Sequence, residues 1–324
     1  MSKSQLSLGS ANLDIFSKTL IDLAEKDQDI LVVTSDSRAS GKLTPFGKKF
    51  PNQMIEIGIA EQNLVGISAG LAASGKKVFA ISPACFLTAR ALEQIKNDIA
   101  YSNRPVKIIG ISAGVSYGSL GSTHHSLHDF AVLQAIHNID IVAPADNFET
   151  IAAIRASVDH PRPIYIRFGK KPLLNLHENG THFEIGKAIL LTPKREQYDV
   201  AFIATGETVA QAYFASVGLS ELGITSCVLS FHSIRPFDKE AVEQAASRSK
   251  VVITVEEHSI NGGLGCHIAS FLMEAGIFRP LKIAGIPDEH TITGNQLEIF
   301  RHYGITQEGL MESAQNLLEK GPDT

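Results

Sequence analysis

The sequence predicts an α/β protein made of two consecutive three-layer αβα domains with mostly parallel sheets. Short, continuously apolar runs rich in β-branched residues alternate with segments of helical periodicity, and strands buried on both faces of a parallel sheet have this composition. The alternation is interrupted once, by polar and irregular sequence over residues 169–196, and then resumes. We therefore expect a first domain at residues 1–170, a linker at 171–196 and a second domain at 197–324.

The elements of the first domain follow from these patterns in order. Strands are predicted at 30–34, 54–57, 78–82, 106–111, 139–142 and 164–167. Helices are predicted near 11–26, 61–74, 87–101, 126–137 and 147–158. Because a helix separates each pair of successive strands from the second strand onward, a parallel sheet covered on both faces is the expected arrangement.

The second domain repeats the pattern after a linker that has room for one short strand. Strands are predicted at 200–204, 227–231, 251–255 and 282–286. Helices are predicted near 207–222, 238–248, 263–275 and 306–319. No repeat of solenoid period occurs, so two ordinary α/β domains remain the interpretation.

Composition excludes several classes of protein. The 324 residues are 44% apolar and 19% charged, and the net charge of −5 offers no basic surface for nucleic acid. No apolar run approaches the roughly 20 residues that span a bilayer, and the first residues lack the apolar core of a signal peptide. Cys85, Cys227 and Cys266 lie far apart in apolar surroundings, which is typical of reduced thiols. We therefore expect a cytoplasmic protein with no membrane and no nucleic-acid partner.

Polar clusters follow four strands of the first domain. They are Ser35–Arg38, Gly58–Asn63, Ala84–Phe86 and the loop Ser116–His128. Ligands of open parallel sheets bind beyond the carboxyl ends of the strands. The four clusters are thus expected to meet in one crevice.

Glu61 is the lone acid in the first turn of a helix that is otherwise small and aliphatic. It could complement the helix dipole or cap backbone amides. It could instead be a carboxyl group held in a dry site to hydrogen-bond one ligand atom. The other polar clusters at the same sheet edge favour the second interpretation.

The glycine-containing loop at 118–129 holds three histidines, His124, His125 and His128. Glycine lets the backbone approach a ligand closely, and imidazole exchanges protons near neutral pH. No cysteine is near and the spacing matches no common closed zinc site, so we predict no metal here. We expect His128 to lie at the start of the following helix and His124 to face a ligand.

These motifs resemble the thiamine-diphosphate enzymes, and most of all the C-terminal half of a transketolase. In the first domain the resemblance rests on the stretches 58–63 (GIAEQN), 86–95 (FLTARALEQI), 122–126 (STHHS) and 141–146 (IVAPAD). In the second domain it rests on 204–208, 233–238, 255–258 and 262–265. The motifs occur in order over nearly the whole chain, which implies a pyrimidine-binding domain followed by a transketolase C-terminal domain.

The resemblance implies roles for cofactor-binding residues. Glu61 matches the catalytic carboxyl group that hydrogen-bonds the aminopyrimidine of thiamine diphosphate, and Phe86 matches the aromatic ring that stacks on it. Asp36 resembles the acid near the cofactor and the subunit contact. His124 matches the catalytic histidine that touches substrate hydroxyls.

The resemblance also implies contacts to a sugar or sugar-phosphate-like substrate. His125 neighbours His124 in the same motif. Arg90, Arg167 and Lys170 fall near positions that bind the terminal anion of the substrate in relatives, although each could equally be a solvated surface charge. Two departures from the family pattern, Leu120 and Ser112, stand where relatives often have an acid and a histidine. The hydroxyl pattern or the terminal group of the substrate is therefore open.

One family motif is missing, because the dipeptide Gly-Asp occurs nowhere in the chain. Transketolases hold magnesium and the diphosphate with Gly-Asp-Gly and a downstream Asn. The resemblance therefore implies a two-chain transketolase whose N-terminal subunit supplies that motif and holds Mg²⁺. A site shared between chains implies an α2β2 assembly, and Gly66 and Gly70, one turn apart, would let two copies pack closely.

Two alternatives remain open at this stage. The β subunit of a 2-oxoacid dehydrogenase E1 component shares the length, the domains and a similar Glu motif, but its loop usually reads Gln-His-Ser. A non-catalytic subunit that retains the fold is the alternative from another class, since fold alone does not establish chemistry. The retained Glu61 and His124 favour an enzyme subunit.

Overall fold

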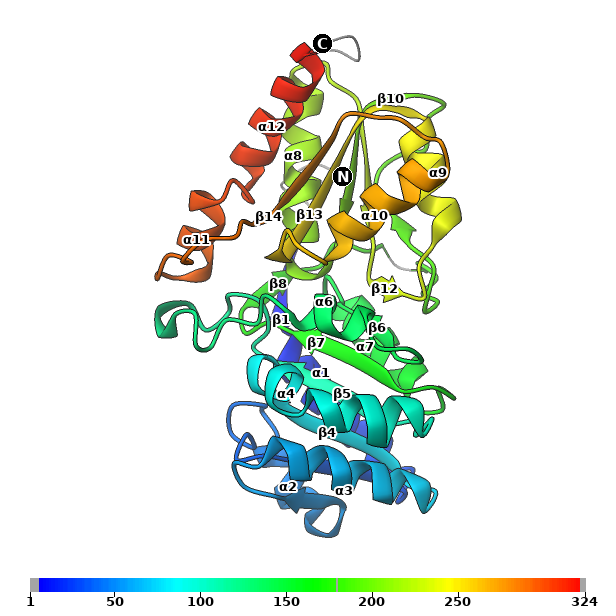
Figure 1. The fold of residues 1–324 in the computed structure, drawn as a ribbon, viewed down its shortest axis with the longest axis vertical. Helices are drawn as coiled ribbons and strands as arrows, with labels where there is room; N and C mark the ends of the chain where they lie inside the picture. The colour runs from blue at the N-terminus through cyan, green and yellow to red at the C-terminus, as the bar shows by residue number, and fades with distance from the viewer. Residues whose placement is uncertain (1–5, 179, 321–324) are drawn as a thin grey trace.

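The computed structural model describes residues 6–178 and 180–320, which form two α/β units stacked one above the other (Figure 1). Each unit has its own sheet, of seven strands in the first and five in the second. A small antiparallel pair, β1 (Leu8–Ala11) with β8 (Pro172–Leu174), ties the beginning of the chain to the segment between the units. Within residues 6–178 and 180–320, no helix has the length and apolar character needed to cross a bilayer.

The seven-stranded sheet has the order β12-β6-β7-β5-β4-β2-β3. Its strands are β2 (Ile30–Thr34), β3 (Met54–Glu56), β4 (Lys77–Pro83), β5 (Lys107–Ile111), β6 (Asp140–Val142), β7 (Ile164–Phe168) and β12 (Ser233–Arg235). All neighbours run parallel except β12, which pairs antiparallel with β6. Every residue of β2, β5 and β7 is buried, because helices cover both faces of the sheet.

Helices cover this sheet in two groups. One face carries α1 (Asn12–Ala24), α2 (Thr44–Lys49) and α7 (Asn147–Ser157). The other carries α3 (Glu61–Ala73), α4 (Ala84–Arg90), α5 (Leu92–Gln94), the π-helix η3 (Ile95–Tyr101) and α6 (Asp129–Gln134). Short 3₁₀ turns lie at η2 (Pro51–Gln53) and η4 (Gly118–Leu120).

The five-stranded sheet has the order β14-β13-β10-β11-β9. Its strands are β9 (Ile189–Leu190), β10 (Tyr198–Ala204), β11 (Ser226–Ser230), β13 (Ser249–Ser259) and β14 (Leu281–Ile286), and only β9 is antiparallel to its neighbour. α9 (Lys239–Ser247) and α10 (Leu264–Glu274) cover one face. The turn η5 (Gly206–Thr208) leads into α8 (Val209–Glu221), which covers the other face with α11 (Gln296–His302) and α12 (Gln307–Lys320).

The predicted fold class is confirmed, with corrections to individual elements. The helix expected at 87–101 begins instead at Ala84, directly after β4, and is interrupted at Ala91 before η3. The elements α2, α11 and β12 were not predicted. β12 follows β11 of the second sheet but completes the first sheet, and one apolar core cluster contains residues of both units. The predicted linker contains the short strands β8 and β9.

Candidate active site

Glu61 is the first residue of α3, and its carboxyl group is almost completely buried. The chain turns between β3 and α3 at Gly58, which has a φ of +79°. The side chain of Glu61 is 2% exposed, and no side-chain hydrogen bond caps the helix. The carboxylate instead accepts a hydrogen bond of 2.5 Å from Nη1 of Arg90. This arrangement disfavours the capping interpretation and leaves an acid that faces a half-exposed cation.

A continuous series of contacts leads away from Glu61 along the carboxyl ends of the strands. The guanidinium of Arg90 lies 5.1 Å from the ring centroid of Phe86. The imidazole of His124 meets the Phe86 ring edge-on at 5.3 Å and the Tyr117 ring at the same distance. The ammonium of Lys170 lies 4.5 Å from the Tyr117 centroid. We call this set the aromatic row: Glu61, Arg90, Phe86, His124, Tyr117 and Lys170.

The imidazole of His124 is oriented by its neighbours. Thr123 Oγ1 lies 2.9 Å from His124 Nδ1, so the hydroxyl and the ring nitrogen share a hydrogen bond. The residue is half-buried between two aromatic rings. A ring held in this way can exchange hydrogen bonds with a ligand hydroxyl and move a proton near neutral pH.

Three of the predicted site residues lie outside the aromatic row, and the first two are Asp36 and His125. Asp36 is exposed at the end of β2, and its backbone N–H donates to Oε1 of Glu56 at 2.7 Å. The side chain of His125 is buried, and its Nε2 bonds to the carbonyl of Gly118 at 3.0 Å. Burial lowers the pKa of His125, which favours a neutral ring. His125 therefore braces the loop from inside rather than facing outward with His124.

Arg167 is also placed elsewhere, at the end of β7 and beneath the second unit. Its guanidinium is 7% exposed, pairs with Asp129 at 2.9 Å and donates to the carbonyl of Glu257 at 2.9 Å. It also lies 4.4 Å from the ring centroid of Phe130. These protein partners already satisfy the charge of Arg167, which disfavours a direct contact between Arg167 and a substrate.

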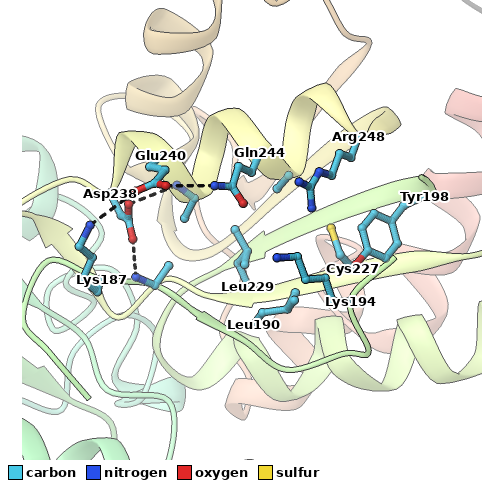
Figure 2. A pocket seen from close by; sticks show the side chains of 13 residues that line it. Lys187, Leu190, Lys194, Tyr198, Cys227, Leu229, Asp238, Glu240, Gln244 and Arg248 are labelled. Atoms are coloured by element: carbon cyan, nitrogen blue, oxygen red, sulfur yellow. Dashed lines mark hydrogen bonds and ion pairs between the residues drawn. The ribbon is translucent and has the colours of Figure 1, made fainter. Parts of the chain in front are cut away.

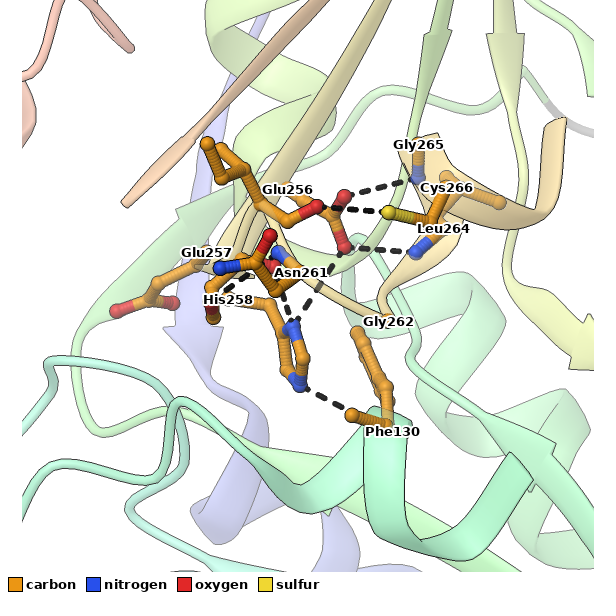
Figure 3. Close-up of polar contacts among 12 residues, drawn as sticks. Phe130, Glu256, Glu257, His258, Asn261, Gly262, Leu264, Gly265 and Cys266 are labelled. Carbon is orange, nitrogen blue, oxygen red and sulfur yellow. Dashed lines mark hydrogen bonds and ion pairs between the residues drawn. The ribbon is translucent and has the colours of Figure 1, made fainter. Parts of the chain in front are cut away.

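The sequence Glu256-Glu257-His258 on β13 forms the joint between the units (Figure 3). Glu256 accepts hydrogen bonds of 2.8 Å from the backbone N–H groups of Leu264 and Gly265 at the start of α10. Burial raises the pKa of Glu256 to about 7. His258 stacks on Phe130 at 5.1 Å, and burial lowers its pKa to about 4, so its ring is neutral. The sequence shows three charged or titratable residues in an apolar strand, but it does not show that they connect the two units.

One hollow of the second unit lies away from the aromatic row. A cavity of about 270 Å³ lies between β9, the following segment and α9, with Lys194, Tyr198, Cys227 and Arg248 toward one end (Figure 2). None of the predicted site residues lines it. Within residues 6–178 and 180–320, no group of three or more His, Cys, Asp or Glu side chains is arranged to hold a metal ion.

Comparison with known protein families decides what this architecture belongs to. Residues 10–174 match the family described as transketolase, pyrimidine binding domain, and residues 190–310 match transketolase, C-terminal domain. The chain belongs to the transketolase family. The resemblance inferred from the motifs is thus confirmed, and the two domains are those of a C-terminal transketolase subunit.

Individual relatives agree with this assignment over almost their full length. An apulose-4-phosphate transketolase subunit of Phocaeicola vulgatus is 48% identical over 306 residues, covering 94% of this chain and 96% of that protein. A 6-deoxy-6-sulfo-D-fructose transketolase subunit of a Clostridium species is 33% identical, covering 95% of this chain and 94% of that protein. A solved structure described as a split gene transketolase, inactive beta4 tetramer, is 32% identical with a TM-score of 0.86 and covers 96% of this chain and 99% of that one.

Proposed function

We propose that this chain is the pyrimidine-binding subunit of a two-chain, thiamine-diphosphate-dependent transketolase. The reaction transfers a two-carbon ketol unit from a ketose to an aldehyde acceptor. The observation that carries the proposal is the buried carboxyl group of Glu61 beside the exposed face of the aromatic row. An acid that is 2% exposed needs a polar partner, and a cofactor ring can provide one.

The pyrimidine end of thiamine diphosphate fits the residues that surround Glu61. The planar guanidinium of Arg90 already lies between the Glu61 carboxylate and the Phe86 ring. A flat pyrimidine that hydrogen-bonds the acid and stacks on the phenyl ring makes the same two kinds of contact. The Arg90 side chain is 46% exposed, so it can swing toward solvent when the ring enters. When bound, the cofactor supplies the nucleophilic carbon and the electron sink of the reaction.

The remaining residues of the aromatic row are suited to bind a sugar. His124, fixed by Thr123, is proposed to hold a substrate hydroxyl and to exchange a proton with it. Lys170, and Arg90 after it has moved, are proposed to attract the anionic group of the substrate. The two relatives described above are named for a phosphate-bearing and a sulfo-bearing ketose, which supports an anionic ketose for this chain.

The diphosphate and Mg²⁺ are proposed to be held by a separate N-terminal subunit that carries Gly-Asp-Gly and a downstream Asn. A cofactor bound between chains requires that the aromatic row face this partner. We also propose that the complex is cytoplasmic. Self-association to α2β2 is proposed through α3, where a Cβ at Gly66 would meet only one side-chain atom within 4 Å and a Cβ at Gly70 would meet none. The open backbone at these two positions would let another helix approach closely.

Reconstitution tests this function. The chain alone, supplied with thiamine diphosphate and Mg²⁺, is expected to be inactive, and ketol transfer is expected when a purified N-terminal subunit is added. Phosphorylated and sulfonated ketoses serve as donors, and a neutral ketose of the same length serves as the control. Ketol transfer by the chain alone, or no transfer by the assembled complex with any donor, would refute the proposal.

A further inference from the structure

The loop that carries His124, taken as residues 113–128 between β5 and α6, is anchored by the second unit near both of its ends. At its start, the backbone N–H of Val115 donates to Oε1 of Glu257 at 2.8 Å. At its end, the backbone N–H of Ser259 donates to the carbonyl of Leu127 at 3.1 Å. Both anchors come from β13, the strand that bears the buried charged sequence. The position of the loop therefore depends on a strand that lies outside the pyrimidine-binding domain.

Glu257 is buried among groups from four different elements. Its side chain is 5% exposed. Gln296 of α11 donates from Nε2 to Glu257 Oε1 at 3.0 Å and from the same atom to Glu207 Oε2 at 2.8 Å. Arg167 of β7 lies 4.0 Å from the other carboxylate oxygen. One amide group thus bridges the buried acid Glu257 and the partly buried acid Glu207, with the Arg167 guanidinium nearby.

The two acids cannot both be charged without cost. Burial, and then the nearby Glu207, raise the pKa of Glu257 to about 8, and burial also raises the pKa of Glu207. Like charges confined in a dry site favour a state in which the pair keeps a proton. At neutral pH the pair holds that proton, and above about pH 8 it loses it.

The backbone of the loop is shaped to accept this carboxyl group. Gly114, immediately before Val115, has a φ of +60°, and a side chain there would collide with the Glu257 carboxyl group. The N–H of Val115 is buried and needs an acceptor, since an unpaired buried amide is destabilising. Glu257 is the acceptor that the structure provides.

We propose that Glu257 is a positioning residue for ketol transfer, because it fixes the start of the 113–128 loop and so holds His124 between Phe86 and Tyr117. Among the residues that the structure describes, the Glu257 carboxyl group bonds to Val115 and Gln296 and lies near Arg167, and none of these belongs to the aromatic row. Glu257 therefore acts through the backbone of the loop. This inference rests on the proposed function, because it assigns importance to the place of His124. The inference differs from the proposed function because it assigns the residue that fixes the position of His124 to the C-terminal domain.

The test uses hydrogen–deuterium exchange and kinetics on the reconstituted complex. Glu257→Ala removes the acceptor and is expected to speed exchange of amides in 113–118 by about tenfold or more, because the Val115 anchor is lost. The same variant is expected to lower kcat by tenfold or more. Glu243→Ala, at an exposed position on α9, is the matched control and should leave both unchanged.

Glu257→Gln is the conservative variant. Its amide oxygen can still accept from Val115, so the slow exchange of the loop and most of kcat are expected to return at pH 7. The Val115 hydrogen bond favours the charged form of Glu257 and lowers its pKa, so the charged carboxylate holds the loop more tightly than the neutral acid does. The wild-type complex is therefore expected to show slower loop exchange as the pH rises through about 8, after correction for intrinsic exchange, and this step should be absent in Glu257→Gln. A merely structural role would not produce a step that the neutral side chain removes.

The outcomes separate this inference from the proposed function. Unchanged loop exchange in a folded Glu257→Ala complex, or a Gln variant as impaired as the Ala variant, overturns the inference. If Glu257→Ala does not fold, Glu257→Asp replaces it, because its shorter side chain keeps the acid but withdraws it from Val115, and the same criteria apply. A wild-type complex without ketol transfer overturns the proposed function, whereas the exchange result stands independently of turnover.

Discussion

The buried imidazole of His177 is predicted to make the stability of the chain depend on pH. His177 lies in the segment between the two units, with Nδ1 2.8 Å from Asp146 Oδ2 and Nε2 3.2 Å from Glu149 Oε1. Burial alone would lower the pKa of His177, but the two carboxylates outweigh it and raise the pKa to about 9. The folded chain therefore keeps a proton that the unfolded chain releases near pH 6.5.

The magnitude follows from that shift. A rise of about 2.5 pKa units corresponds to about 3 kcal/mol of folding free energy. Because the folded-state pKa is raised, this stabilisation is fully present below about pH 6.5 and is lost as the pH rises through about 9. Lys107 and Glu257 also titrate in this range, so the comparison must be between the wild type and a variant.

The variant is His177→Gln, and the assay is urea denaturation at pH 6 and pH 10. We expect the difference in unfolding free energy between wild type and variant to be about 3 kcal/mol smaller at pH 10 than at pH 6. His182→Gln, which alters an exposed histidine in the same segment, is the control and should show no such change. A difference that stays constant within about 0.5 kcal/mol across this range would refute the proposed charge of His177.

Two further predictions concern single cations. Arg90→Ala removes the partner of the buried Glu61 carboxylate and is expected to destabilise the free chain by about 1 kcal/mol, a value reduced because the Arg90 side chain is 46% exposed. Adding Glu61→Gln should restore stability, because the buried charge is then removed. A double-mutant cycle measured by denaturation checks both effects. Lys107 is 2% exposed, and burial lowers its pKa to about 8. Since a lowered pKa means that the charged form costs stability below about pH 8, Lys107→Met should stabilise the chain by up to about 3 kcal/mol at pH 7 and little at pH 11. Equal effects at both pH values in thermal denaturation would contradict this.

Local patterns in the sequence were enough to predict the central strands and α3. β2, β5 and β7 are buried on both faces, so their sequences are apolar throughout and stand out from the rest. α11 was missed although it has a local signal, since Asn295 and Glu298 form a capping box. β12 could not have been found in this way, because its pairing with β6 joins residues about ninety positions apart and only three residues take part.

The candidate site likewise contains residues that local sequence patterns located and residues that only the tertiary structure places. Motifs near strand ends located Glu61, Phe86, Arg90 and His124, which the structure brings together with Lys170 in the aromatic row. Tyr117 was missed because a lone tyrosine in a loop carries no spacing signal. The inward turn of Arg167 depends on Asp129 and Glu257, which are distant in sequence. Long-range charge pairing of this kind is set by tertiary structure and leaves no local pattern.

The central claim is that Glu61 of this chain serves a cofactor whose other end is held by a partner subunit. The most direct measurement compares wild type with Glu61→Gln in the reconstituted complex, with assembly monitored by sedimentation and cofactor binding by calorimetry. We expect the Gln variant to assemble with the N-terminal subunit and yet to lose ketol transfer by a hundredfold or more, because a neutral amide cannot replace the acid at the pyrimidine. Turnover within a few-fold of wild type in the assembled variant would contradict the account.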